Sequence, residues 1–282
     1  MRPSGLSTSR KVFSRYSFSL PTMTLSDVQT ISEKIYSAMG GSRGNVHVGR
    51  GDDVDAIVGT AGGVRMDYNI SSDSIRLIDL DLSRSRDTEL VSEEYAKTRA
   101  QEVLSGLEQS GVLVVGDFRM SAASLQKLMM GTGSSDGALS QDIKEYQFFV
   151  RREIDGVPVN NGEQMDLGLS IAVHRSGSIS RVEISALGLS WVKLGEIEQD
   201  KDEQFLQDLS ARYATAIIED QSIRYSIGFD GGPRRVFRVS ESFRVEGRQL
   251  NSRWNTVYYP LGGGEPTLWP TLSPDDVGDP RQ

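Results

Sequence analysis

Apolar and polar residues alternate along this chain with two different spacings. Between residues 26 and 41, apolar side chains recur at every third or fourth position, for example at Val28, Ile31 and Ile35. This spacing is typical of an amphipathic helix. Between residues 64 and 70 they occupy every second position, as in a strand that buries one face. The chain therefore predicts a helix followed by strands.

The ends of this first helix carry signals of their own. Ser26 and Gln29 have the spacing of a capping box, which favours a helix start at Ser26. Gly40 and Gly41 favour a stop, because glycine readily adopts the backbone conformation that ends a helix.

The order of helix and strands recurs twice more. Helical spacing is found again over residues 92–111 and 200–218, and a shorter helix is predicted over 121–130. Alternating strands are predicted over residues 74–82, 145–154, 165–173, 179–185, 222–229, 234–245 and 252–259. We therefore expect an α+β fold of repeated units, each a helix packed on an antiparallel sheet.

The expected division of the chain follows this repeat. It comprises a flexible N-terminal arm at 1–23, three helix-plus-sheet units at 24–88, 89–195 and 196–260, and a Pro- and Gly-rich tail at 261–282. The tail is set apart because its prolines cannot donate hydrogen bonds to a sheet.

The segment EIDGVPVNNGEQ, residues 153–164, has the residue types of a turn. Gly156 allows a positive φ, Pro158 lacks an amide hydrogen, and Asn160 and Asn161 tolerate left-handed backbone geometry. The segment therefore predicts a turn followed by an edge strand.

The longer stretch around this turn, residues 146–182, resembles the propeptide module of thermolysin- and fungalysin-type peptidases. In that module an aromatic strand runs into Gly-Val-Pro-Val, a long strand, a Gly turn and a final strand. The helix-plus-strand units resemble PepSY domains, which YycH/YycI-type extracytoplasmic regulators combine in a similar way. The resemblance covers roughly residues 145–184. It implies a PepSY-like fold and a binding or inhibitory role outside the cytoplasm, on a peptidase or sensor protein.

Two features depart from that family. Asn160 and Asn161 stand where the propeptides commonly have an apolar or aromatic residue and Gly. No His-Glu-x-x-His motif occurs in the chain, so the peptidase that such a propeptide would serve is not encoded in it.

Composition narrows the classes of partner. The formal net charge of −8 argues against nucleic acid as a general partner, since phosphate binding requires clustered positive charge. No apolar run approaches the ~20 residues that a membrane-spanning helix requires. The Ser- and Arg-rich N-terminal residues fit either a transit segment or a flexible arm, and removal of an upstream signal peptide would favour a periplasmic or extracellular location.

Candidate catalytic and metal-binding residues are sparse. His47 and His174 are the two histidines of the chain, and neither has an evident orienting partner in the sequence. Asp52, Asp53 and Asp55 offer oxygen ligands for a cation but lack the distal Glu of an EF-hand loop. We expect no cofactor, no metal site and no enzymatic activity; Asp79 and Asp81 are predicted to face solvent on one strand.

An excess of positive charge marks the third predicted unit. Residues 222–254 contain seven arginines and three carboxylates, near Trp and Tyr side chains that are frequent in binding hot spots. The predicted partner-binding residues are Arg224, Arg238, Arg244, Trp254 and Tyr258. The same arginines also fit a solvated sheet face paired with the acidic helix before them.

The sequence thus favours a non-enzymatic protein-binding or regulatory module that acts through sheet edges and an Arg-rich sheet face. A structural or assembly component of a cell-envelope or surface complex is the alternative. A hydrolase comes third, because catalytic residue types are scarce.

Overall fold

The computed structural model describes most of the chain. The described residues are 11–41, 46–51, 56–84, 89–133, 139–161, 166–198, 202–213, 217–227, 232–245, 248–262 and 265–269. Within them, strands greatly outnumber helices, with strands β1 to β15 and helices α1 to α4.

The chain divides into two compact units that are not contiguous in sequence. The larger unit comprises Leu20–Glu153 and Leu167–Ser190. The smaller unit comprises Met1–Ser19, Ile154–Asp166 and Trp191–Gln282.

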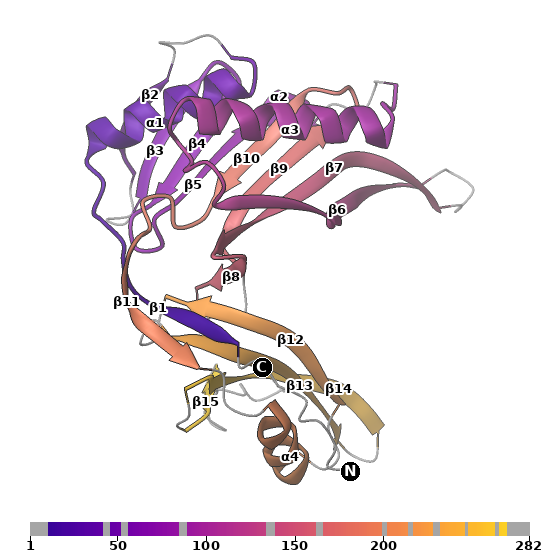
Figure 1. Ribbon diagram of the computed structural model, residues 1–282. Coiled ribbons are helices and arrows are strands. Elements are labelled where there is room, and N and C mark those ends of the chain that lie inside the picture. Colours follow the sequence, from indigo (N-terminus) through magenta and orange to yellow (C-terminus); the bar gives the residue numbers. More distant parts are fainter. Residues whose placement is uncertain are drawn as a thin grey trace, which may run out of the picture. The chain divides into compact units, whose positions relative to one another are not determined.

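The larger unit is built on one antiparallel sheet (Figure 1). Its strand order is β6-β7-β9-β10-β5-β4-β3-β2. The strands are β2 (His47–Arg50), β3 (Ala56–Ala61), β4 (Val64–Asn69), β5 (Ser74–Asp79), β6 (Phe118–Gly133), β7 (Leu139–Ile154), β9 (Gly168–His174) and β10 (Ile179–Ile184). The helices are α1 (Leu25–Ala38), α2 (Leu80–Arg84) and α3 (Glu93–Gln109).

Helices α1 and α3 lie across one face of this sheet (Figure 1). The apolar side chains of each strand point toward these helices. Neighbouring apolar residues on adjacent strands therefore form continuous buried rows. One such row consists of Met66, Leu77, Val182, Ile171 and Phe148. The helices supply the other side of the core through Val28, Ile35, Ala96, Ala100, Val103 and Leu107.

The predicted fold class, repeated units of a helix on its own sheet, is wrong. Strand β5 pairs with β10, with Leu77 opposite Val182, so strands from the first two predicted repeats belong to one sheet. The result is a sheet-dominated fold with two helices on a shared surface. Local alternation predicts strands but carries no information about which distant strand each one pairs with.

Two local predictions also fail. Helix α1 begins at Leu25 with Thr24 as its N-cap, and the capping box joins Thr24 with Asp27, not Ser26 with Gln29. The segment predicted as a helix over 121–130 lies in strand β6, where backbone pairing with β7 overrides its local preference.

In the smaller unit the paired strands have the order β15-β14-β13-β12-β8, and β12 runs parallel to β8. A short two-stranded ribbon accompanies them. Apart from the ribbon, the elements of this unit are β8 (Val157–Asn160), β12 (Ile217–Ser226), β13 (Pro233–Val245), β14 (Arg248–Pro260), β15 (Thr267–Trp269) and α4 (Asp202–Arg212). The aromatic core here includes Phe205, Phe237 and Tyr259.

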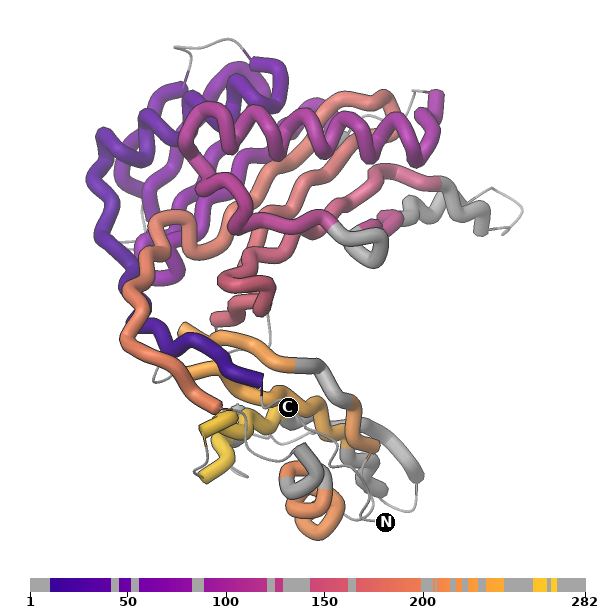
Figure 2. The backbone as a smooth tube through the Cα atoms, viewed as in Figure 1, coloured from indigo at the N-terminus to yellow at the C-terminus, as the bar shows by residue number. Residues whose placement is uncertain are grey.

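The ribbon pairs β1 (Val12–Ser19) with β11 (Ser190–Glu198), which run side by side although far apart in sequence (Figure 2). Strand β1 lies within the predicted flexible arm. Tyr16 is buried there, edge-on to Tyr225 at 5.3 Å between ring centroids.

The turn at residues 153–164 is confirmed in part. Asp155 and Gly156 both have positive φ, at 51° and 73°. The strand that follows, β8, lies between β12 and β7 in the strand order, so it is an inner strand and the predicted edge position is wrong.

Candidate functional site

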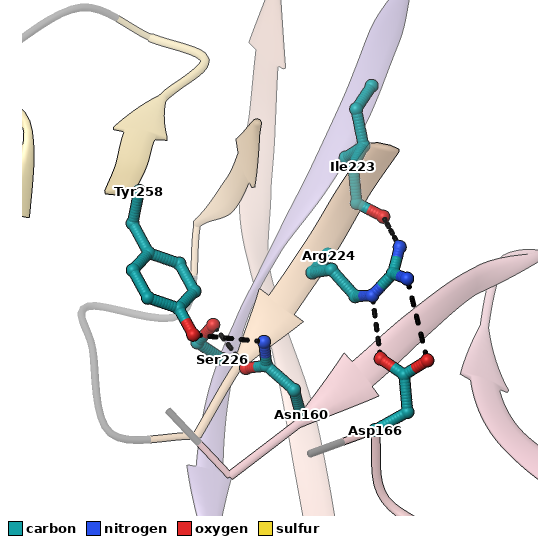
Figure 3. A network of polar contacts seen from close by, with 6 residues as sticks. All are labelled: Asn160, Asp166, Ile223, Arg224, Ser226 and Tyr258. Carbon is teal, nitrogen blue, oxygen red and sulfur yellow. Dashed lines mark hydrogen bonds and ion pairs between the residues drawn. The ribbon is translucent and has the colours of Figure 1, made fainter. Parts of the chain in front are cut away.

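Two of the predicted partner-binding residues are buried in the smaller unit. Arg224 is 7% exposed and Tyr258 is 0% exposed. The guanidinium of Arg224 makes a bidentate contact with Asp166, at 2.6 Å from Nε to Oδ1 and 3.4 Å from Nη2 to Oδ2 (Figure 3). In this arrangement Arg224 neutralises an internal carboxylate and does not present its charge on a surface.

The other three residues lie on the β13–β14 hairpin. Arg238 is half-buried on β13. In the β13–β14 ladder, Arg244 lies opposite Gln249 and Trp254 lies opposite Ser240, so the two occupy different parts of the hairpin. The side chains of Arg244 and Trp254 lie outside the described residues.

Tyr258 belongs to a polar network that joins β8 to the sheet (Figure 3). The Ser226 hydroxyl donates to Asn160 Oδ1 at 2.5 Å, and Asn160 Nδ2 donates to the Tyr258 hydroxyl at 3.5 Å. The backbone N–H of Ile227 donates to the Asn160 carbonyl at 3.1 Å. These bonds satisfy buried polar groups and fix the parallel register of β8 and β12, which is a structural role.

A second buried polar cluster clamps a loop of the larger unit. Arg152, 3% exposed, donates to the carbonyls of Ala186 at 2.6 Å and Leu189 at 3.0 Å. Asp73 accepts from the Tyr68 hydroxyl at 2.7 Å and from the Gly188 N–H at 2.5 Å. Burial raises the pKa of the Asp73 carboxyl, and its bonds to Tyr68 and Gly188 oppose that shift.

The backbone of this loop clamp is strained. Asp73 and Ala186 have positive φ, at 46° and 49°, a region that side chains other than glycine rarely adopt. Both residues are almost completely buried. The cluster therefore holds the loop after β10 in place.

The two histidines occupy different environments. His174 is 0% exposed, and its Nδ1 accepts from the Ser176 N–H at 3.2 Å. Glu145 lies opposite His174 in the β7–β9 ladder and accepts from the Ser180 hydroxyl at 2.9 Å. His47 is exposed on strand β2.

In the described part of the chain, no group of three or more His, Asp or Glu side chains could hold a metal ion. Asp52, Asp53 and Asp55 lie outside the described residues. Asp79 accepts from the N–H groups of Asp81 and Leu82, so it caps α2 and does not share a strand face with Asp81 as predicted.

A groove lies at strand β2, the last strand in the order of the larger unit's sheet. Its volume is about 840 Å³. The lining includes the ladder neighbours His47, Thr60 and Arg65 and the pair Gly49 and Val58. A side chain placed on Gly49 would meet nothing within 4 Å, so the groove is unobstructed there.

The backbone of β2 offers hydrogen-bonding groups on the side away from β3. The Gly51 N–H donates to the Ala56 carbonyl at 2.9 Å, so residue 51 faces β3. Because alternate residues of an antiparallel pair face opposite sides, Val46, Val48 and Arg50 direct their N–H and C=O groups outward. An outward row of backbone groups is a template for another strand. The sequence predicted the use of sheet edges but did not identify β2.

None of the helices in the described residues is both long and apolar enough to span a bilayer.

Comparisons with known proteins define the fold alone. No family model matches the sequence, and no curated protein matches it. A crystal structure of an uncharacterized protein from Eubacterium rectale is similar, with a TM-score of 0.56 over 91% of this chain and 86% of that one. At 13% sequence identity, this likeness concerns the arrangement of the backbone.

Proposed function

We propose that the protein is a non-enzymatic binding module whose β2 edge takes up an extended segment of a protein partner. The observation that carries the proposal is the outward row of β2 backbone groups beside an open groove. In strand addition, main-chain hydrogen bonds supply affinity and neighbouring side chains supply specificity.

The β2 edge supports this function better than the Arg-rich strands do. Arg224 is committed to Asp166, and Tyr258 is buried, so neither contributes to a docking surface. Around the groove, by contrast, His47 and Thr60 are exposed, and the Arg65 side chain is 56% exposed. The resemblance of residues 145–184 to peptidase propeptides favours a peptidase or sensor protein outside the cytoplasm as the partner.

A peptide selection tests the proposal. Random peptides displayed on phage are selected on the wild-type protein, and the affinities of the enriched peptides are measured for Arg50→Pro and Arg50→Ala. The proline removes the outward N–H of residue 50 and leaves the β2–β3 ladder intact, because that N–H does not point toward β3.

The expected result is a loss of roughly tenfold in affinity for Arg50→Pro beyond any change for Arg50→Ala, about the value of one hydrogen bond. Selection of no peptide, or equal affinities for the two variants, contradicts the proposal. Concentration-dependent dimers that Arg50→Pro abolishes would instead favour the assembly role.

A further inference from the structure

Part of the β2 edge is already occupied by a side chain from helix α1. Gln29 Nε2 donates to the Val46 carbonyl at 2.5 Å. The Val48 N–H donates to Gln29 Oε1 at 3.2 Å. One primary amide therefore satisfies two of the outward groups of the edge.

This pair of bonds reproduces what a partner strand would make. A strand that pairs with an edge donates one N–H and accepts with one C=O at successive outward groups. The amide of glutamine presents a donor and an acceptor in one plane. Gln29 thus occupies the positions that one N–H and one C=O group of an added strand would take.

Glu33 holds the amide in this orientation. Gln29 Nε2 also donates to Glu33 Oε1 at 2.6 Å, one helical turn further along α1. Because a carboxylate only accepts, the NH₂ group must face both Glu33 and the Val46 carbonyl, which leaves Oε1 toward the Val48 N–H. The contact is built by two residues of the helix.

The occupied section ends at Val48. The Val48 C=O and the N–H and C=O of Arg50 also point outward by strand alternation. Among the described residues, no backbone–backbone hydrogen bond is made by these groups. The edge therefore has a covered section at Val46–Val48 and an open section at Val48–Arg50.

We infer that Gln29 is an intramolecular competitor at the strand-addition site. An extended partner segment begins pairing at the open section, and pairing along the full length of β2 requires displacement of the Gln29 amide. This inference rests on the proposed function and adds its regulation: the amide restricts the edge to partners whose backbone replaces both of its bonds.

A purely structural tie between α1 and β2 makes a different prediction. Such a tie predicts that loss of the amide lowers stability and leaves peptide affinity unchanged or weaker. A competitor predicts that loss of the amide exposes the Val48 N–H and strengthens peptide binding.

The experiment uses the full chain as wild type, Gln29→Ala, Gln29→Glu and a control, Gln101→Ala, which removes a glutamine from the exposed surface of α3. Hydrogen exchange of the Val48 N–H is measured by NMR, and affinity is measured for the phage-selected peptide. Gln29→Glu is included because its carboxylate faces the Val46 carbonyl and Glu33 without a donor.

For Gln29→Ala, we expect Val48 exchange to accelerate about tenfold and peptide affinity to rise about fivefold, near the net value of one hydrogen bond. For Gln29→Glu, which keeps an acceptor for the Val48 N–H but loses the donor to the Val46 carbonyl, we expect peptide affinity to rise as well. Gln101→Ala should match the wild type in both. Unchanged Val48 exchange in Gln29→Ala overturns the inference, as does unchanged or weaker affinity in that variant.

The two proposals fail in distinguishable ways. If peptides bind through Arg50 but the Gln29 variants bind no better, the competitor role is wrong and strand addition stands. If Val48 exchange accelerates but no peptide binds any variant, strand addition is wrong and the competitor role falls with it.

Discussion

Arg224 and Arg152 are buried cations, and each lies beside groups that neutralise or solvate it. Arg224 forms a bidentate pair with Asp166, whereas Arg152 donates to two carbonyls and lies over the Phe118 ring at 5.4 Å. A buried charge costs several kcal/mol unless such partners are present. These arginines are therefore part of the interior architecture of their units.

Arg224→Ala is expected to lower the free energy of unfolding by about 3–5 kcal/mol, because it leaves the Asp166 carboxylate buried without its partner. The side chains of the pair are only 9% and 15% exposed. Urea denaturation measures the change.

Two further variants serve as controls. Arg224→Ala with Asp166→Ala should lose less than the sum of the single changes, since no lone charge remains. Arg65→Ala, which removes an exposed partner of Asp67, should cost at most about 1 kcal/mol. Equal losses for Arg224→Ala and Arg65→Ala would show that the buried pair has no special role.

At the scale of single elements, the N-cap of α1 decides which residues close the start of the helix and which are left for other contacts. Thr24 Oγ1 accepts from the Asp27 N–H, and Asp27 accepts from the Thr24 N–H at 3.0 Å. With the cap placed at Thr24, Gln29 faces strand β2 instead of the helix start. The bond from Thr24 also lowers the pKa of Asp27.

Thr24→Ala should therefore lower the free energy of unfolding by about 1 kcal/mol, the usual value of an N-cap, whereas Ser26→Ala should change it by less than about 0.5 kcal/mol. Thermal or urea unfolding of both variants decides between the two helix starts. A larger loss for Ser26→Ala would place the cap where the sequence pattern alone puts it.

At the scale of the whole molecule, the two units differ in how they are assembled from the chain. All strands and helices of the larger unit lie between residues 20 and 190, with residues 154–166 as an excursion. The smaller unit takes β1 from before this span and β8 from within it. Its fold therefore depends on segments brought together over long sequence distances.

The fragment 20–190 is expected to fold alone, with a cooperative urea transition and dispersed NMR signals, because it retains the complete core of α1, α3 and their sheet. The fragment 191–282 is expected to remain unfolded, since it lacks the Tyr16 side chain that packs on Tyr225 and the β8 partner of β12. A folded 191–282 fragment, or an unfolded 20–190 fragment, would contradict this assembly.

The sequence by itself determined the local elements for which side-chain periodicity is strong. The helical spacing of Val28 and Ile35 and the alternation over residues 64–70 correspond to α1 and β4, because burial of one face requires those periods. The positive φ at Gly156 was likewise readable from residue type.

Only the tertiary structure decided which elements meet. The pairing of β5 with β10, the insertion of β8 beside β12 and the contact of Gln29 with the β2 edge all join residues that are distant in sequence. Strand pairing uses backbone groups that every residue possesses, so the local pattern cannot name the partner. For the same reason, the sequence predicted that Arg224 lies on a binding surface, whereas its pairing with Asp166 places it in the interior.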